Sequence, residues 1–229
     1  MRLIFVRHGE PDYGNDCLTP TGEKQAAACA KRLACEGISE IYSSPNGRAF
    51  QTAGYTAREL GLPITKLDYM HEISWGGEGI PENGHPWFLG SRMLYEDNFD
   101  FMKDDWRKHP YFEGNIATKC FDEVTSKFDA FLETKGYRHE GNHYLCTAEN
   151  NETIAVFGHG GSSGCVISSI LGLPMPYVFS MFPYEFTSII IFHFPSKSGK
   201  YVTPRVELFN DTAHTRDISS GLVFQKDSQ

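Results

Sequence analysis

Two histidines in this 229-residue chain each follow an apolar run that predicts a buried strand. Leu3 to Val6 is unbroken and bulky, and Arg7-His8-Gly9 comes directly after it. Thr153 to Phe157 is a second such run, and it ends in Gly158-His159-Gly160-Gly161. Because open α/β sheets bind ligands beyond the carboxyl ends of their strands, both histidines are candidates for one site. The alternative is that each strand turns polar only because it has reached the surface.

Two arginines and a glutamate accompany these histidines. Arg7 precedes the first histidine, and Arg48 lies about one turn into a helix predicted to follow Ser44-Pro45. There an arginine can share an anion with the free N–H groups of the helix N-terminus, although arginines on helix surfaces are common. Glu72 follows an apolar approach and precedes a glycine-rich turn. Alone, such a glutamate would be ordinary solvated surface.

Together these residue types suit phosphoryl transfer. Arginine binds phosphoryl oxygens through paired, charge-assisted hydrogen bonds. A neutral imidazole can attack phosphorus near neutral pH. A carboxylic acid that burial keeps protonated can give the leaving oxygen its proton. The set therefore predicts a nucleophilic histidine, an anion clamp and a general acid.

Alternating strands and helices must position these groups. The predicted helices run from Thr19-Pro20 to a stop at Gly37, from Ser44-Pro45 to about Leu60, from Lys119 to Lys135 and from Ser162 to Leu171. Further strands are predicted at Ile38–Tyr42, Leu62–Leu67, Phe182–Phe194 and Tyr201–Phe209, the last two as an antiparallel hairpin around Ser196–Lys200. This order predicts an α/β fold. The segment from Gly136 to Glu152 is polar and rich in turn residues.

The composition changes between Gly76 and Thr118. Glycines, prolines and aromatic residues crowd this segment, which has little clear periodicity. Such segments are often lids or binding loops, and an aromatic lid could cover a substrate of some bulk. Aromatic residues that only pack an insertion onto the body are an equal alternative. No repeat or linker divides the chain, so we expect one domain over residues 1–229 with a lid at about 76–118.

Charge and cysteine usage limit the partners and the compartment. The net charge of -8 argues against a nucleic-acid partner and against an anionic membrane surface. The six cysteines have no paired spacing typical of zinc or of a disulfide framework, which favours a reducing compartment. No run of eighteen apolar residues and no signal core is present. We therefore expect a cytoplasmic protein.

The ordered motifs of the chain resemble the histidine phosphatase superfamily, in its phosphoglycerate-mutase-like branch. They are Arg7-His8-Gly9-Glu10, Leu18–Gly22 with Gln25-Ala26, Ser44–Ala53, Met70-His71-Glu72 and Gly158–Gly161. The resemblance spans the chain from Arg2 to about His214. It implies a three-layer α/β/α fold of the phosphoglycerate mutase type, with a mostly parallel central sheet and an antiparallel edge.

The resemblance also implies a role for each site residue. His8 is the expected nucleophile, which becomes phosphohistidine. Arg7, Arg48 and His159 are the expected phosphate clamp, with Gly160 of the same motif as a further phosphate-binding residue. Glu72 is the expected general acid and then the base that activates water. No metal or cofactor is expected, because arginine and histidine supply the positive charge.

Three departures from the family pattern stand out. Asn46 occupies a place that is usually leucine, which alters packing near Arg48 but removes no catalytic group. Asn15 is a candidate for a substrate-binding asparagine found after the first motif, but its spacing differs. Asn115–Thr118 stands where many relatives carry Gly-Glu-Ser.

The leading hypothesis for function is hydrolysis of a small phosphorylated metabolite through phosphohistidine. Phosphoglycerate mutase-type transfer is the alternative within catalysis, and the atypical 76–118 segment weighs against it. A catalytically silent phosphate-binding module is a third hypothesis, but such a module would not need both a nucleophile and an acid. The substrate and the oligomeric state stay open, with a dimer among the options.

Overall fold

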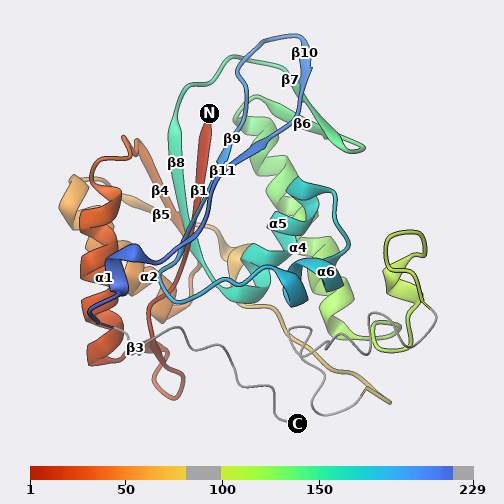
Figure 1. Cartoon of the computed structure of the whole chain (residues 1–229), viewed down its shortest axis with the longest axis horizontal. Coiled ribbons are helices and arrows are strands. Elements are labelled where there is room, and N and C mark those ends of the chain that lie inside the picture. The colour runs from red at the N-terminus through yellow and green to blue at the C-terminus, as the bar shows by residue number, and fades with distance from the viewer. Residues whose placement is uncertain (81–98, 219–229) are drawn as a thin grey trace.

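The computed structural model describes residues 1–80 and 99–218, and its centre is a six-stranded sheet (Figure 1). In spatial order the strands are β11 (Arg205–Asp211), β9 (Ile189–His193), β1 (Arg2–Arg7), β8 (Thr153–Gly158), β4 (Glu40–Ser43) and β5 (Ile64–Lys66). The pairs β1–β8, β8–β4 and β4–β5 are parallel, and β9 and β11 continue the sheet antiparallel on the other side of β1. The predicted mostly parallel sheet with an antiparallel edge is confirmed.

Strand β1 lies inside the sheet because its side chains are apolar on both faces. Leu3 and Phe5 belong to the core on one face, and Ile4 and Val6 belong to the core on the other. All four side chains are fully buried. A strand of this kind needs cover on both sides.

Helices supply that cover (Figure 1). On the face of Ile4 and Val6 lie α1 (Pro20–Leu33) and α2 (Gly47–Leu60), which add Leu33 and Ala53 to that core. On the other face lie α4 (Ile116–Thr134), α5 (Gly160–Leu171) and α6 (Met175–Met181). The three-layer α/β/α arrangement predicted from the resemblance is therefore confirmed.

Most helices begin or end near the predicted residues, with some corrections. The Thr19 side chain caps α1 by accepting the Gly22 N–H, as expected for Thr-Pro, but α1 ends at Leu33 and not at Gly37. α2 begins at Gly47, so Ser44 does not cap it. α4 begins three residues early, because the Asn115 side chain accepts the Ala117 N–H and caps it there.

A three-stranded sheet and one helix were not predicted. The sheet pairs β6 (Tyr137–Glu140), β7 (His143–Cys146) and β10 (Lys200–Val202), and the helix is α6. The predicted hairpin between the last two strand regions is therefore wrong in part. β9 pairs with β11 across the intervening segment, whereas β10 leaves to pair with β7. The β6–β7 strands have few buried side chains, so their sequence lacks an apolar signal.

The predicted lid is described in part. Residues 81–98, with Trp87, Phe88, Met93 and Tyr95, lie outside the described residues. Between 99 and 118, Phe101, Trp106 and Phe112 are buried, and their rings contact one another and Tyr177 of α6. The aromatic residues of this described part thus pack the segment onto the body, as the packing alternative predicted.

Within residues 1–80 and 99–218, no single helix is long and apolar enough to cross a membrane. Only α5 and α6 taken together reach that length and composition, and they are bent by 117° at the break between them.

Candidate active site

Four neighbouring parallel strands end at one edge of the sheet, and each is followed by part of one site. Arg7 ends β1 and His8 follows it, while His159 follows β8. Arg48 lies in the first turn of α2, after β4, and Glu72 comes after β5 and the 3-10 turn Asp68–Met70. The imidazole rings of His8 and His159 are 5.2 Å apart between centroids. The structure therefore brings these five predicted residues together where open α/β sheets bind ligands.

His8 is held in the protonation state that a nucleophile needs. Its Nδ1 lies 2.7 Å from the carbonyl oxygen of Gly9, which can only accept, so the proton is on Nδ1 and the lone pair is on Nε2. Burial and the positive charge of Arg7 lower the pKa of His8 to about 3. The imidazole is therefore neutral and fixed in one tautomer at physiological pH.

The guanidinium of Arg7 is fixed on two sides. Its Nη1 donates to the Tyr184 carbonyl oxygen at 2.5 Å, and its Cζ lies 4.5 Å from the ring centre of Phe186. Phe186 also contacts the His8 ring at 5.5 Å between centroids. The aromatic ring thus restricts both the Arg7 guanidinium and the His8 imidazole.

Arg48 is held by Asp16, a residue that the sequence did not single out. Asp16 accepts from Arg48 Nη1 through Oδ1 at 2.5 Å and from the Gly47 N–H through Oδ2 at 2.7 Å. Although partial burial opposes it, these hydrogen bonds lower the pKa of Asp16, so the carboxylate stays charged. Asp16 has a positive φ of 48°, a conformation that Asn and Asp tolerate better than most residues. An acidic residue in a turn-rich loop gave no signal for this role.

His159 has a partner that the sequence assigned elsewhere. Ser44, expected to cap a helix, places its Oγ 2.8 Å from His159 Nε2. Both residues are completely buried. Burial and the nearby His8 and Arg48 lower the pKa of His159 well below its usual value. In the protein without substrate, His159 is therefore neutral.

Three buried nitrogen atoms around His8 have no hydrogen-bond partner among the described residues. They are Nε of Arg7, Nε of Arg48 and Nδ1 of His159. A buried N–H without a partner costs free energy, and such groups in native proteins usually have a functional reason. Donors of this kind beside a nucleophile match the oxygens of a phosphoryl group.

Among residues 1–80 and 99–218, the hydrogen bonds to the Glu72 carboxyl group all reach one oxygen. Its Oε1 accepts from the backbone N–H groups of Ile73 at 3.0 Å, Gly161 at 3.0 Å and Ser162 at 3.2 Å. A Cβ on Gly161 would lie 2.4 Å from this oxygen, so the approach requires glycine there. Burial raises the pKa of Glu72, although these hydrogen bonds and the positive charge of Arg7 act to lower it. Oε1 therefore serves as the anchored oxygen, and Oε2 can carry the acidic proton.

The remaining predicted residues are placed less centrally. Gly160 is the first residue of α5 and directly follows His159, whereas the N–H groups of the next two residues are bound to Glu72 Oε1. Asn15 is exposed, and its side-chain amide donates to Asp12 Oδ2 at 2.8 Å in the β2–β3 turn (Pro11–Asp12 and Cys17–Leu18). The Asn15 side chain thus bonds within its own turn, whereas its neighbour Asp16 bonds Arg48 directly.

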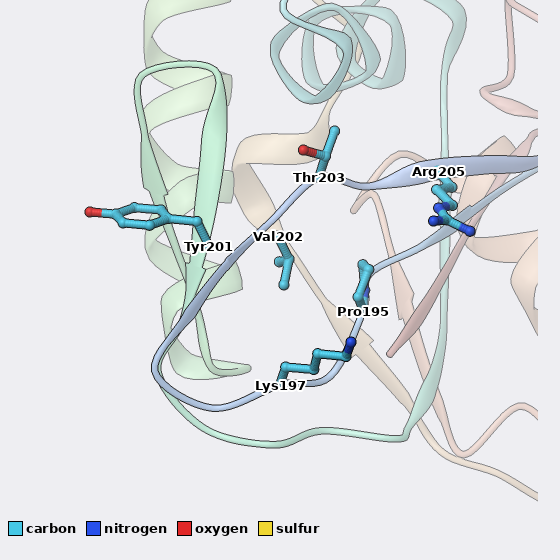
Figure 2. Close-up of a pocket in the computed structure, with 6 residues that line it drawn as sticks. All are labelled: Pro195, Lys197, Tyr201, Val202, Thr203 and Arg205. Atoms are coloured by element: carbon cyan, nitrogen blue, oxygen red, sulfur yellow. The ribbon is translucent and has the colours of Figure 1, made fainter.

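A hollow of about 400 Å³ lies away from this site (Figure 2). It is lined by Pro195, Lys197, Tyr201, Val202, Thr203 and Arg205. In the sheet register Arg205 pairs with His193 and His193 pairs with Arg2, the first residue of β1. The hollow is therefore at the opposite end of β1 from His8 and does not belong to the active site.

The buried histidines should make stability depend on pH. Burial lowers the pKa values of His8, His159 and His214. Below about pH 6.5 the unfolded chain therefore binds protons at these histidines, and the folded protein does not. We expect the free energy of unfolding to fall as the pH drops from 6.5 to 5, by up to about 1.4 kcal/mol per pH unit for each histidine. Urea denaturation at several pH values measures this slope. His8→Ala should reduce the slope, and equal slopes in both proteins would contradict the prediction.

Known proteins resemble the chain in sequence and structure. The putative phosphoserine phosphatase 2 of Hydrogenobacter thermophilus is 23% identical over 227 residues, which cover 95% of this chain and 99% of that protein. The probable phosphoglycerate mutase GpmB of Serratia proteamaculans is 26% identical over 187 residues, 76% of each chain. The phosphoserine phosphatase of Entamoeba histolytica, solved with 3-phosphoglyceric acid, has a TM-score of 0.61 at 21% identity and covers 93% of this chain and 98% of its own.

The likeness to solved structures supports the fold, and a match to a family model shows the family to which the chain belongs. The model that describes branch 1 of the histidine phosphatase superfamily matches residues 3–207. This range contains His8 after β1 and His159 after β8, as well as Arg48 and Glu72. With the match covering most of the chain, the protein belongs to the histidine phosphatase superfamily.

Proposed function

We propose that the protein is a phosphomonoesterase that hydrolyses a small phosphorylated metabolite through a phosphohistidine on His8. The observation that carries the proposal is the neutral His8 imidazole, whose Nδ1–H is bound to Gly9 and whose Nε2 is left for attack. It lies among buried nitrogen atoms of Arg7, Arg48 and His159 that have no partner among the described residues.

In the first step His8 Nε2 forms a bond to phosphorus, and the bond from phosphorus to the ester oxygen breaks. Arg7 and Arg48 stabilise the charge on the non-bridging oxygens. Glu72 Oε2 gives its proton to the leaving oxygen, which departs as an alcohol. The hydrogen bond from His8 Nδ1 to Gly9 persists and stabilises the positive charge on the phosphorylated ring.

In the second step water attacks the same phosphorus atom. Glu72, now a carboxylate, takes the proton of this water, and the bond between phosphorus and His8 Nε2 breaks. The electron pair returns to Nε2, and Glu72 is again protonated. Inorganic phosphate leaves, and both groups are restored for another turnover.

Metal independence is part of the proposal. The guanidinium groups of Arg7 and Arg48 supply positive charge that a divalent ion would otherwise provide. We propose that the enzyme acts on phosphoric monoesters with no added metal. Activity that persists unchanged in excess chelator would agree with this, and loss of activity restored by one divalent ion would contradict it.

Phosphoglycerate mutase-type transfer is the second candidate, because GpmB is among the similar proteins. A mutase must return the phosphoryl group to another oxygen of a substrate that it retains. The similarity to proteins named phosphoserine phosphatase covers more of the chain, which favours hydrolysis. The names of these relatives suggest small phosphorylated acids as the first substrates to test.

One assay separates the two candidates. The protein is incubated with a panel of phosphorylated metabolites that includes phosphoserine and both monophosphoglycerates, and phosphate release is measured beside 31P NMR of the organic phosphates. We expect phosphate release from at least one compound with kcat/KM of about 10⁴ M⁻¹s⁻¹ or more. Interconversion of phosphoglycerates without phosphate release would establish the mutase. No turnover of any ester would favour the silent binding module.

A further inference from the structure

The side chain of Asn46 joins two parts of the active site that come from different strands. Asn46 is the N-cap residue of α2, but its side chain makes no capping hydrogen bond. Instead Oδ1 accepts from the backbone N–H of Glu72 at 3.2 Å and lies 3.3 Å from Ser44 Oγ. The usual reason for asparagine at an N-cap therefore does not apply here.

The first arm of this contact leads to the phosphate clamp. Ser44 Oγ accepts from the Asn46 N–H at 3.2 Å and lies 2.8 Å from His159 Nε2. The single hydroxyl hydrogen of Ser44 has two acceptors within reach, His159 Nε2 and Asn46 Oδ1. When the hydrogen points to Asn46 Oδ1, Ser44 Oγ can accept a hydrogen bond from a protonated Nε2 of His159. Both ring nitrogens of His159 can then carry protons, with Nδ1–H directed to a bound phosphoryl oxygen.

The second arm leads to the acid. Glu72 is held at its carboxyl group by the N-terminus of α5, through Gly161 and Ser162. The Asn46 contact holds the backbone of the same residue from α2. Leucine, which usually stands at this place in the family pattern, offers no acceptor for the Glu72 N–H or for the Ser44 hydroxyl. The departure from leucine thus has a definite structural consequence.

We propose that Asn46 is a positioning residue that bridges the general acid and the phosphate clamp, a proposal that rests on the function proposed above. Through the Glu72 backbone it orients the carboxyl group toward the leaving oxygen. Through Ser44 it allows His159 to carry a second proton when a phosphate dianion is bound. Asn46 touches neither the phosphorus nor the leaving group, and it acts only through these two residues.

The test uses Asn46→Ala and Asn46→Leu in two assays. Calorimetry with inorganic phosphate measures the clamp without requiring turnover, and we expect binding to weaken about 3- to 10-fold, the equivalent of one neutral hydrogen bond. Turnover of an alkyl phosphate relative to p-nitrophenyl phosphate measures the acid, and this ratio should fall by a similar factor. Leucine keeps more of the side-chain volume than alanine does. Asn46→Leu therefore replaces Asn46→Ala in both assays if thermal melting shows that the alanine variant is unstable.

A double-mutant cycle with Ser44→Ala separates the two arms. In the Ser44→Ala background, Asn46→Ala should no longer weaken phosphate binding, but it should still lower the ratio of alkyl to aryl turnover. Additive effects on phosphate binding would overturn the route through Ser44. Unchanged phosphate binding and an unchanged ratio in both Asn46 variants would overturn the bridge as a whole.

The control is Asn151→Leu, which makes the same chemical change at an exposed residue before β8 and should alter neither measurement. Failure of the proposed function has a different signature. In that case the wild-type protein would turn over no ester, while the calorimetric effect of Asn46 on phosphate binding could still be measured.

Discussion

Replacing His8 with alanine is expected to lower kcat/KM for every phosphomonoester by about 10⁴-fold or more, because covalent catalysis then has no nucleophile. Alanine removes the Nε2 lone pair and also the hydrogen bond to Gly9. The clamp residues Arg7, Arg48 and His159 remain. Steady-state rates with p-nitrophenyl phosphate measure the loss. Rapid quenching in base with 31P NMR should show an acid-labile phosphoprotein in the wild type only.

A second histidine provides a matched control for this variant. His139 is a half-buried residue of β6 that bonds Asp129 and stacks on Tyr144, outside the described site. His139→Ala should keep turnover within a few-fold of wild type. His8→Ala should still bind inorganic phosphate in calorimetry, which shows that the clamp is folded. Turnover by His8→Ala close to the wild-type rate would rule out His8 as the nucleophile.

The sequence predicted the positions of the two candidate histidines because each follows a strand whose apolar pattern is strong. Leu3 to Val6 and Thr153 to Phe157 have to be buried, and parallel strands bring their carboxyl ends to one edge. The residues after those ends, His8 and His159, therefore had to be neighbours. Arg48 followed from the next strand and helix in the same way. The apolar pattern of each short segment was enough to predict these positions, because the strands of the sheet are buried and their sequences show it.

The supporting residues could not be predicted in the same way, because their contacts join segments far apart in sequence. Asp16 bonds Arg48 across 32 residues, and Ser44 meets His159 across 115. A serine before a proline commonly caps a helix, and an aspartate in a loop commonly forms a turn. The sequence therefore indicated these local roles and not the contacts with His159 and Arg48. Departure from the family pattern at Asn46 was visible, but its link to Glu72 depends on three-dimensional placement.

The three-stranded sheet of β6, β7 and β10 was missed for a different physical reason, although β10 overlaps the predicted strand Tyr201–Phe209. β6 and β10 each bury a single side chain and leave the others half-buried or exposed, so neither has the apolar alternation that marks a half-buried strand. Their pairing with β7 is fixed by backbone hydrogen bonds and by a few buried side chains such as Tyr137 and Val202. A sequence pattern reports burial, and it says little about strands held mainly by their backbones.

Glu72→Gln is expected to separate the two chemical steps. Glutamine keeps an Oε1 that can accept from Ile73, Gly161 and Ser162, so the anchored geometry survives, but its amide nitrogen cannot donate a proton as an acid does. Phosphorylation of His8 by alkyl phosphates should slow by about 10²- to 10⁴-fold. An aryl phosphate needs little protonation of its leaving group, so its phosphorylation step should change far less.

The variant should therefore give a burst with p-nitrophenyl phosphate. One equivalent of nitrophenolate should be released quickly, followed by slow turnover, because the step in which Glu72 activates water is also impaired. Phosphohistidine should accumulate with the aryl ester and not with an alkyl ester, which stopped-flow absorbance and 31P NMR measure. Glu78→Gln, at an exposed glutamate six residues later, is the control and should show no burst beyond that of the wild type. Equal slowing of phosphorylation by both classes of ester would remove Glu72 from the role of acid, whereas a much larger slowing with the alkyl ester than with the aryl ester would assign protonation of the leaving oxygen to Glu72.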